Sequence, residues 1–135
     1  MKIYFAGSIR GGRDDKEIYS KIINLLQKYG EVLTKHVGDA KISQIGELDA
    51  ADFLHKRDMQ WLHDSDIVVA EVTAPSLGVG YELGIAETLN KGVLCLYRET
   101  PEKSLSAMVQ GNKAFIVKKY KTVDDLPEIF EEFFQ

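Results

Sequence analysis

Residues 67–84 read IVVAEVTAPSLGVGYELG, and they contain the clearest indication of the fold. Its first part, 67–72, is a short apolar run rich in β-branched residues, which is typical of a buried strand. A turn rich in glycine follows, and from residue 80 to residue 91 apolar side chains recur at helical spacing. A strand that passes through a turn into a helix is the repeating unit of α/β proteins. The stretch therefore predicts an α/β fold.

The rest of the chain repeats this alternation. Strands are predicted at 3–6, 31–34, 93–97 and 115–117, and helices at 14–29, 49–64 and 122–134, with Gly30 and Gly92 as C-terminal stops. Helices that connect successive strands form right-handed crossovers and cover both faces of a parallel sheet. The pattern predicts a three-layer sandwich with a five-stranded parallel sheet, of the flavodoxin-like or Rossmann-like type.

Composition limits the size of the protein and its partners. With 135 residues, 44% of them hydrophobic, the chain can form one domain over residues 1–135. A net charge of -4 argues against binding to a nucleic-acid polymer. The single cysteine, Cys95, cannot form an internal disulfide and is expected to be a reduced core residue. Without a long apolar stretch or signal-peptide pattern, we expect a cytoplasmic protein with no membrane partner.

Ligands of such sheets bind beyond the carboxyl ends of the strands, so the loops that follow the strands are the candidate ligand sites. The first is GSIRGGR (7–13), where glycines permit close approach and Ser8 and Arg10 can hold an anion. A flexible loop with solvated arginines is the alternative. The second, with Gly78, Gly80 and Gly84, has GxGxxxG spacing. Neither loop matches the P-loop or the GxGxxG fingerprint, so the sequence does not indicate binding of ATP or NAD.

Two carboxylates lie on apolar helix faces. Glu82 precedes Ile85 and Ala86 by one turn, and Asp58 lies between Leu54 and Leu62. Burial of two carboxylates costs free energy, so a pair that points inward indicates a functional site. Such a pair is typical of enzymes that cleave glycosidic bonds. Glu82, near a helix start, fits the nucleophile, and Asp58, in an apolar stripe, fits the general acid. A glutamate that only complements the helix dipole is the alternative.

A tyrosine and three histidines complete the set of candidates. Tyr4, near the end of the first strand, could orient Glu82 or could equally be a core residue with a satisfied hydroxyl. His36, His55 and His63 lack metal-ligand spacing, and the last two are predicted at exposed helix positions. We therefore predict no metal site and no cofactor.

These residues lie in motifs that resemble the 2'-deoxynucleoside 5'-phosphate N-hydrolases, relatives of the nucleoside 2-deoxyribosyltransferases. The motifs are YFAGSIRGGR (4–13), VLTKHV (32–37), RDMQWLHDSDIVVAEVTAPSLGVGYELG (57–84) and LSAM (105–108). The resemblance implies hydrolysis of a 2'-deoxyribonucleoside 5'-monophosphate to free base and 2-deoxyribose 5-phosphate. It implies a covalent intermediate on Glu82, protonation of the base by Asp58 and positioning of the nucleophile by Tyr4.

The resemblance also implies which residues bind the nucleotide. They are Gly7, Ser8, Ile9, Arg10, Gly11, Gly12, Arg13, His36, Ser76 and Gly78, joined by Ser106, Ala107 and Met108 from the other subunit of a homodimer. A deoxyribosyltransferase, a ribonucleotide N-hydrolase and a catalytically silent nucleotide-binding module remain as alternatives. The preferred base stays open.

Overall fold

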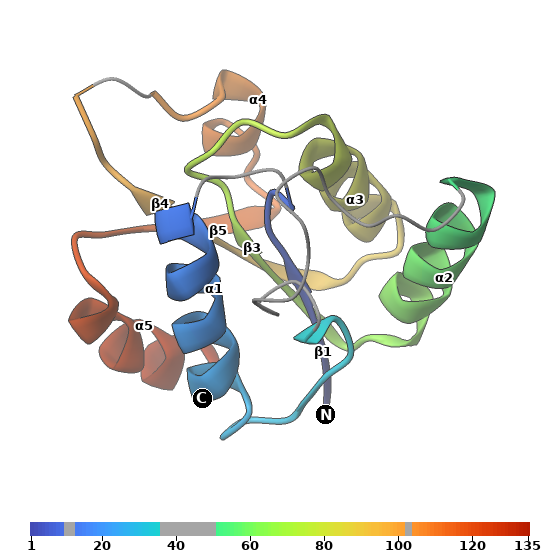
Figure 1. Ribbon diagram of the computed structural model, residues 1–135, viewed down its shortest axis with the longest axis horizontal. Coiled ribbons are helices and arrows are strands. Elements are labelled where there is room, and N and C mark those ends of the chain that lie inside the picture. The colour runs from blue at the N-terminus through green and yellow to red at the C-terminus, as the bar shows by residue number, and fades with distance from the viewer. Residues whose placement is uncertain (10–12, 36–50, 102–103) are drawn as a thin grey trace.

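The computed structural model of the chain describes residues 1–9, 13–35, 51–101 and 104–135, in which strands and helices alternate (Figure 1). The strands are β1 (Lys2–Ala6), β2 (Glu31–Val32), β3 (Ile67–Glu71), β4 (Gly92–Arg98) and β5 (Phe115–Tyr120). The helices are α1 (Arg13–Leu26), α2 (Ala51–Asp64), α3 (Leu77–Thr88), α4 (Ala107–Gln110) and α5 (Leu126–Phe133), with a 3-10 turn at Val123–Asp125 before α5. The four-residue helix α4 was not among the predicted elements.

The strands form one sheet in the order β2-β1-β3-β4-β5, and every neighbouring pair is parallel. The predicted five-stranded parallel sheet is therefore confirmed, with the strand order of the flavodoxin-like type. The chain leaves β1 toward β2 on one side and returns to β3 on the other. The crevice between the carboxyl ends of β1 and β3 is the switch point at which such sheets bind ligands.

Helices cover both faces of the sheet, as expected for a three-layer sandwich (Figure 1). Ile3 and Phe5 of β1 belong to the core shared with α1 and α5, while Tyr4 and Ala6 belong to the core shared with α2 and α3. Cys95 is fully buried in this second core, where burial raises its pKa to about 12. Within the described ranges, no helix combines the length and the apolar character needed to span a membrane.

The two glycines predicted as helix stops have another role. Helix α3 ends at Thr88, and Asn90, with a φ of 57°, takes the left-handed conformation beyond it. Gly92 is already the first residue of β4, where a Cβ would lie 2.8 Å from Ile67 Cδ1. At Gly30, a Cβ would lie 2.4 Å from the Met1 carbonyl oxygen. The prediction was wrong because both glycines serve close packing next to the sheet.

Helix α3 begins three residues earlier than predicted. Ser76 caps it, since its Oγ accepts a hydrogen bond from the Val79 amide at 3.2 Å. The helix therefore starts at Leu77 and runs through Gly78 and Gly80. As a consequence, Glu82 lies in the second turn of α3 and not in the first.

Candidate active site

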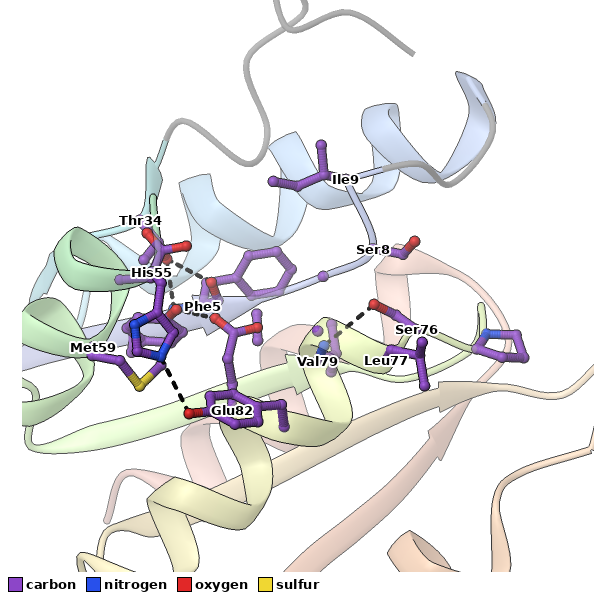
Figure 2. Close-up of a pocket in the computed structure, with 17 residues that line it drawn as sticks. Phe5, Ser8, Ile9, Thr34, His55, Met59, Ser76, Leu77, Val79 and Glu82 are labelled. Atoms are coloured by element: carbon purple, nitrogen blue, oxygen red, sulfur yellow. Dashed lines mark hydrogen bonds between the residues drawn. The ribbon is translucent and has the colours of Figure 1, made fainter. Parts of the chain in front are cut away.

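A pocket of about 580 Å³ opens at the carboxyl ends of β1 and β3 (Figure 2). The end of β1, the start of α3 and one face of α2 form its walls. The residues that line it are Tyr4, Phe5, Ala6, Gly7, Ser8, Ile9, Thr34, His55, Asp58, Met59, Pro75, Ser76, Leu77, Gly78, Val79, Tyr81 and Glu82. The pocket lies at the switch point of the sheet and brings together Tyr4, Asp58 and Glu82.

Tyr4 and Glu82 form the centre of this pocket. Tyr4 is 1% exposed, and its hydroxyl donates a hydrogen bond to Glu82 Oε2. Burial, opposed by the Tyr4 hydrogen bond and reinforced by the nearby Asp58 charge, raises the pKa of Glu82 to about 7. Burial and the Glu82 charge raise the pKa of Tyr4 far above its usual range, so the phenol remains a donor. The pair can present an oriented carboxylate whose ionised fraction rises with pH through about 7.

The structure changes the reason why Glu82 can ionise. The helix dipole acts mainly within the first turn of a helix, and Glu82 belongs to the second turn of α3. The start of the helix therefore does not stabilise the Glu82 charge as predicted. The Tyr4 hydroxyl, 78 residues away in sequence, supplies the stabilising hydrogen bond instead.

Asp58 lies on the α2 wall of the pocket and has an ion-pair partner that the sequence did not reveal. Arg57 Nε and Nη2 both lie 3.0 Å from Asp58 Oδ1. The Arg57 guanidinium stands 4.7 Å from the centre of the Trp61 ring. With 26% of its side chain exposed, Asp58 is less deeply buried than the apolar stripe suggested. Arg57 therefore fixes the direction of this carboxylate.

Five of the predicted nucleotide-binding residues line the pocket: Gly7, Ser8, Ile9, Ser76 and Gly78. At Gly7, a Cβ would lie 2.9 Å from the Tyr19 ring, so glycine permits this approach. The Ser8 amide donates to the Tyr19 hydroxyl at 3.1 Å. Arg13 is the first residue of α1. Outside the described part of the chain lie the Arg13 side chain and residues Arg10, Gly11, Gly12 and His36.

The remaining three, Ser106, Ala107 and Met108, do not line the pocket of their own chain. Ser106 caps α4 by accepting a hydrogen bond from the Met108 amide at 3.2 Å. Ser106 and Met108 line a second groove of about 610 Å³, which runs along the other side of α3. The groove and the pocket share Pro75, Ser76, Leu77 and Val79, so they meet at the start of α3.

The pocket also contains residues that the sequence analysis did not assign to it. His55 was predicted as an exposed helix residue, and it is exposed, but it lies at the pocket wall. Its Nε2 lies 3.2 Å from the hydroxyl of Tyr81, a residue that was not among the predicted site residues. A usable signal existed, because His55 precedes Asp58 by about one helical turn and Tyr81 adjoins Glu82.

A buried polar cluster supports the loops beside the pocket. Glu71, 1% exposed, accepts hydrogen bonds from the Thr73 amide at 2.7 Å, the Thr73 hydroxyl at 2.9 Å and the Tyr120 hydroxyl. Arg98 pairs with Asp15 at 2.9 Å and lies 3.8 Å from Glu71. Burial raises the pKa of Glu71, and these contacts oppose that rise. The cluster ties the ends of β3, β4 and β5 to α1.

Comparison with known proteins shows which family this fold and pocket represent. The sequence model of the family described as nucleoside 2-deoxyribosyltransferase matches residues 3–123. A putative 2'-deoxynucleoside 5'-phosphate N-hydrolase 1 of Nematostella vectensis is 56% identical over 98% of this chain and 93% of its own length. The 5-hydroxymethyl-dUMP N-hydrolase of Esox lucius is 53% identical, over 100% of this chain and 97% of its own.

Solved structures agree on the fold. A 2-deoxyribosyltransferase from Bacillus psychrosaccharolyticus superposes with a TM-score of 0.70 at 18% identity, over 94% of this chain and 90% of its own. A CMP N-glycosidase of Clostridium botulinum has a TM-score of 0.68, also at 18% identity, over 97% of this chain and 99% of its own. The resemblance found in the sequence motifs is thus confirmed by sequence identity along the whole chain. This protein belongs to the nucleoside 2-deoxyribosyltransferase family.

Proposed function

We propose that this chain hydrolyses the N-glycosidic bond of 2'-deoxynucleoside 5'-monophosphates to the free base and 2-deoxyribose 5-phosphate. The hydrogen bond from Tyr4 to Glu82, in a pocket that also contains Asp58, is the observation that carries the proposal. Two relatives that match nearly the whole chain are named for this class of reaction. A silent binding module would not need a carboxylate whose pKa is about 7 beside a second carboxylate.

The proposed reaction proceeds in two steps. In the reactive form the two carboxylates hold one proton, which Asp58 carries. The ionised Glu82 carboxylate attacks C1' of the sugar while the C1'–N bond breaks, and Asp58 gives that proton to the departing base. A water molecule then attacks C1' and releases Glu82, and the proton of that water passes to Asp58. Tyr4 donates to the Glu82 oxygen and keeps the carboxylate directed at the sugar.

The arrangement of the pocket orients the nucleotide. Figure 2 shows Ser8 and Ser76 on one side of Glu82, and His55 and Met59 on the other. The Ser76 Oγ accepts from the Val79 amide, and its own proton stays available for a phosphate oxygen. The start of α3 adds amides that favour an anion. These features support a phosphate beside Ser8 and Ser76 and a base beside Asp58 and Met59.

The names of the relatives suggest the base. Because several are named 5-hydroxymethyl-dUMP N-hydrolases, we propose 5-hydroxymethyl-dUMP as a substrate. The test is to incubate the protein with this nucleotide, with no acceptor base, and to separate the products by chromatography. Release of free base with 2-deoxyribose 5-phosphate supports hydrolysis. Turnover that requires an acceptor base identifies a transferase, and equal cleavage of ribonucleotides identifies a ribonucleotide N-hydrolase.

The 5'-phosphate should be required. Charge-assisted hydrogen bonds contribute about 1.5–3 kcal/mol each, so two contacts at Ser8 and Ser76 correspond to at least about 10²-fold in kcat/KM. We expect kcat/KM for 5-hydroxymethyl-2'-deoxyuridine to be lower than kcat/KM for its monophosphate by at least this factor. The measurement is kcat/KM for the two compounds under the same conditions. Comparable values would remove the phosphate site from the proposal.

The homodimer with shared sites belongs to the same proposal. Leu77 and Met108 are 97% and 83% exposed, and both line the apolar groove beside α3. A second copy seated in this groove would cover both side chains. Because the groove meets the pocket at Ser76 and Leu77, Ser106 of the second copy could reach the phosphate there. Ser106 does not line the pocket of its own chain, which supports a role for this residue in the pocket of the other chain.

Mixing two inactive variants should restore activity if sites are shared. A Glu82→Ala chain lacks the nucleophile, and a Ser106→Asp chain repels the substrate phosphate. In a mixed dimer, one site carries both substitutions and the other carries neither, so we expect about half the wild-type rate per mixed dimer. Base release is measured after subunit exchange has been verified by native mass spectrometry. If folded, exchanged variants stay inactive, Ser106 does not serve the site of another chain.

A further inference from the structure

Helices α2 and α3 are bridged at the pocket by a polar pair that the proposed reaction does not use. His55 Nε2 lies 3.2 Å from the Tyr81 hydroxyl, with the ring centres 5.9 Å apart and the planes inclined by 56°. Both side chains line the pocket, and Tyr81 is 52% exposed. A hydrogen bond between exposed side chains competes with water and contributes little to folding. The stability of the fold therefore does not account for the pair.

The position of the pair places it at the base end of the pocket. His55 and Met59 lie across Glu82 from Ser8 and Ser76 (Figure 2). His55 is one helical turn before Asp58, the proposed proton donor to the base. A nucleotide with its phosphate at Ser76 and its C1' at Glu82 thus extends its base toward His55 and Tyr81.

The chemistry of the pair fits a ligand hydroxyl. One proton links Nε2 and the phenol oxygen, and the remaining lone pairs of that oxygen can accept another hydrogen bond. A hydroxyl group can donate to it, whereas a methyl group cannot. We propose that His55 and Tyr81 recognise the hydroxyl of a 5-hydroxymethyl group on the base. The inference rests on the proposed function and names the part of the site that selects the substrate.

The test compares two nucleotides that differ by this hydroxyl, 5-hydroxymethyl-dUMP and thymidine 5'-monophosphate. The readout is the ratio of their kcat/KM values. Tyr81→Phe should lower the ratio of 5-hydroxymethyl-dUMP to thymidine 5'-monophosphate about tenfold, which corresponds to the loss of one hydrogen bond. The change should come mainly from a lower kcat/KM for 5-hydroxymethyl-dUMP. His55→Ala should lower the ratio in the same direction, because it removes the partner that orients the phenol.

Matched controls make the same chemical changes elsewhere. Tyr29→Phe removes a hydroxyl from a ring that stacks on Phe134, and His63→Ala removes an exposed imidazole at the end of α2. Neither residue lines the pocket, and both variants should keep the wild-type ratio. An unchanged ratio in Tyr81→Phe, or an equal fall for both nucleotides, would overturn the inference.

Binding measurements test this inference independently of the proposed reaction. Calorimetry with the Glu82→Ala chain gives the ratio of Kd values for the two nucleotides without turnover. A shift of about tenfold on adding Tyr81→Phe supports the recognition role even where the wild-type chain releases no base. Absence of base release in the wild type, by contrast, contradicts only the proposed reaction. An unchanged Kd ratio contradicts the role of the pair.

Discussion

Replacing Glu82 with alanine should lower the rate of base release by at least about 10³-fold, while the chain stays folded. The reason is that the proposed reaction needs this carboxylate to form the covalent bond to C1', and the Tyr4 hydroxyl donates a hydrogen bond to it. Glu82 is partly buried at the pocket wall, so its removal leaves the core packing of α3 at Leu83 and Ala86 in place. Chromatography of 5-hydroxymethyl-dUMP reactions gives the rate, and circular dichroism gives Tm.

Glu131→Ala is the matched control, since Glu131 is exposed on α5 outside the pocket and should leave the rate unchanged. Intact mass spectrometry of the quenched reaction, followed by peptide mapping, adds a direct readout of the intermediate. The wild-type chain should carry the deoxyribosyl phosphate on the peptide that contains Glu82. A Glu82→Ala chain that turns over at the wild-type rate would refute the assignment of the nucleophile.

Replacing Asp58 with asparagine should lower kcat by about 10² to 10⁴-fold, the usual contribution of a general acid. Asparagine has nearly the same shape but cannot deliver a proton to the departing base. The loss should depend on the leaving group. With 4-nitrophenyl 2-deoxyribose 5-phosphate, whose leaving group departs without protonation, the variant should retain much more of the wild-type rate.

Asp64→Asn is the control for this substitution. Asp64 ends the same helix and accepts a hydrogen bond from Gln60 at 3.0 Å, away from the pocket. This variant should behave as the wild type with both substrates. Equal losses for the two leaving groups in Asp58→Asn would mean that Asp58 positions the nucleotide and does not act as the acid.

The sequence by itself was sufficient for the order of the strands and of the helices longer than four residues, and for the parallel sheet. Apolar periodicity is a local property, and the connection of successive strands by helices leaves few topologies. The ends of the elements were less accurate, because they depend on single contacts. Ser76 caps α3 before the apolar pattern of the helix begins. After α3, the left-handed residue is Asn90 and not Gly92.

The sequence also singled out Tyr4, Asp58 and Glu82, which the fold brings to one pocket, because burial of a carboxylate or a phenol on an apolar face costs free energy. Their contacts were left open by the residue pattern, in which Tyr4 could orient Glu82 or be a core residue. Tyr4 contacts Glu82 only because β1 pairs with β3 and α3 packs over that part of the sheet. A contact between residues 78 positions apart has no local pattern in the chain.

Several partners were decided by the tertiary structure alone. Arg57 turns toward Asp58 on its own helix, a choice of side-chain rotamer that spacing does not determine. His55 meets Tyr81 because two helices pack side by side at the pocket. The buried Glu71 carboxylate is tolerated in the core because it accepts hydrogen bonds from Thr73 in the following loop and from Tyr120 in a distant strand. Local periodicity thus determined which elements form, and packing determined which side chains meet.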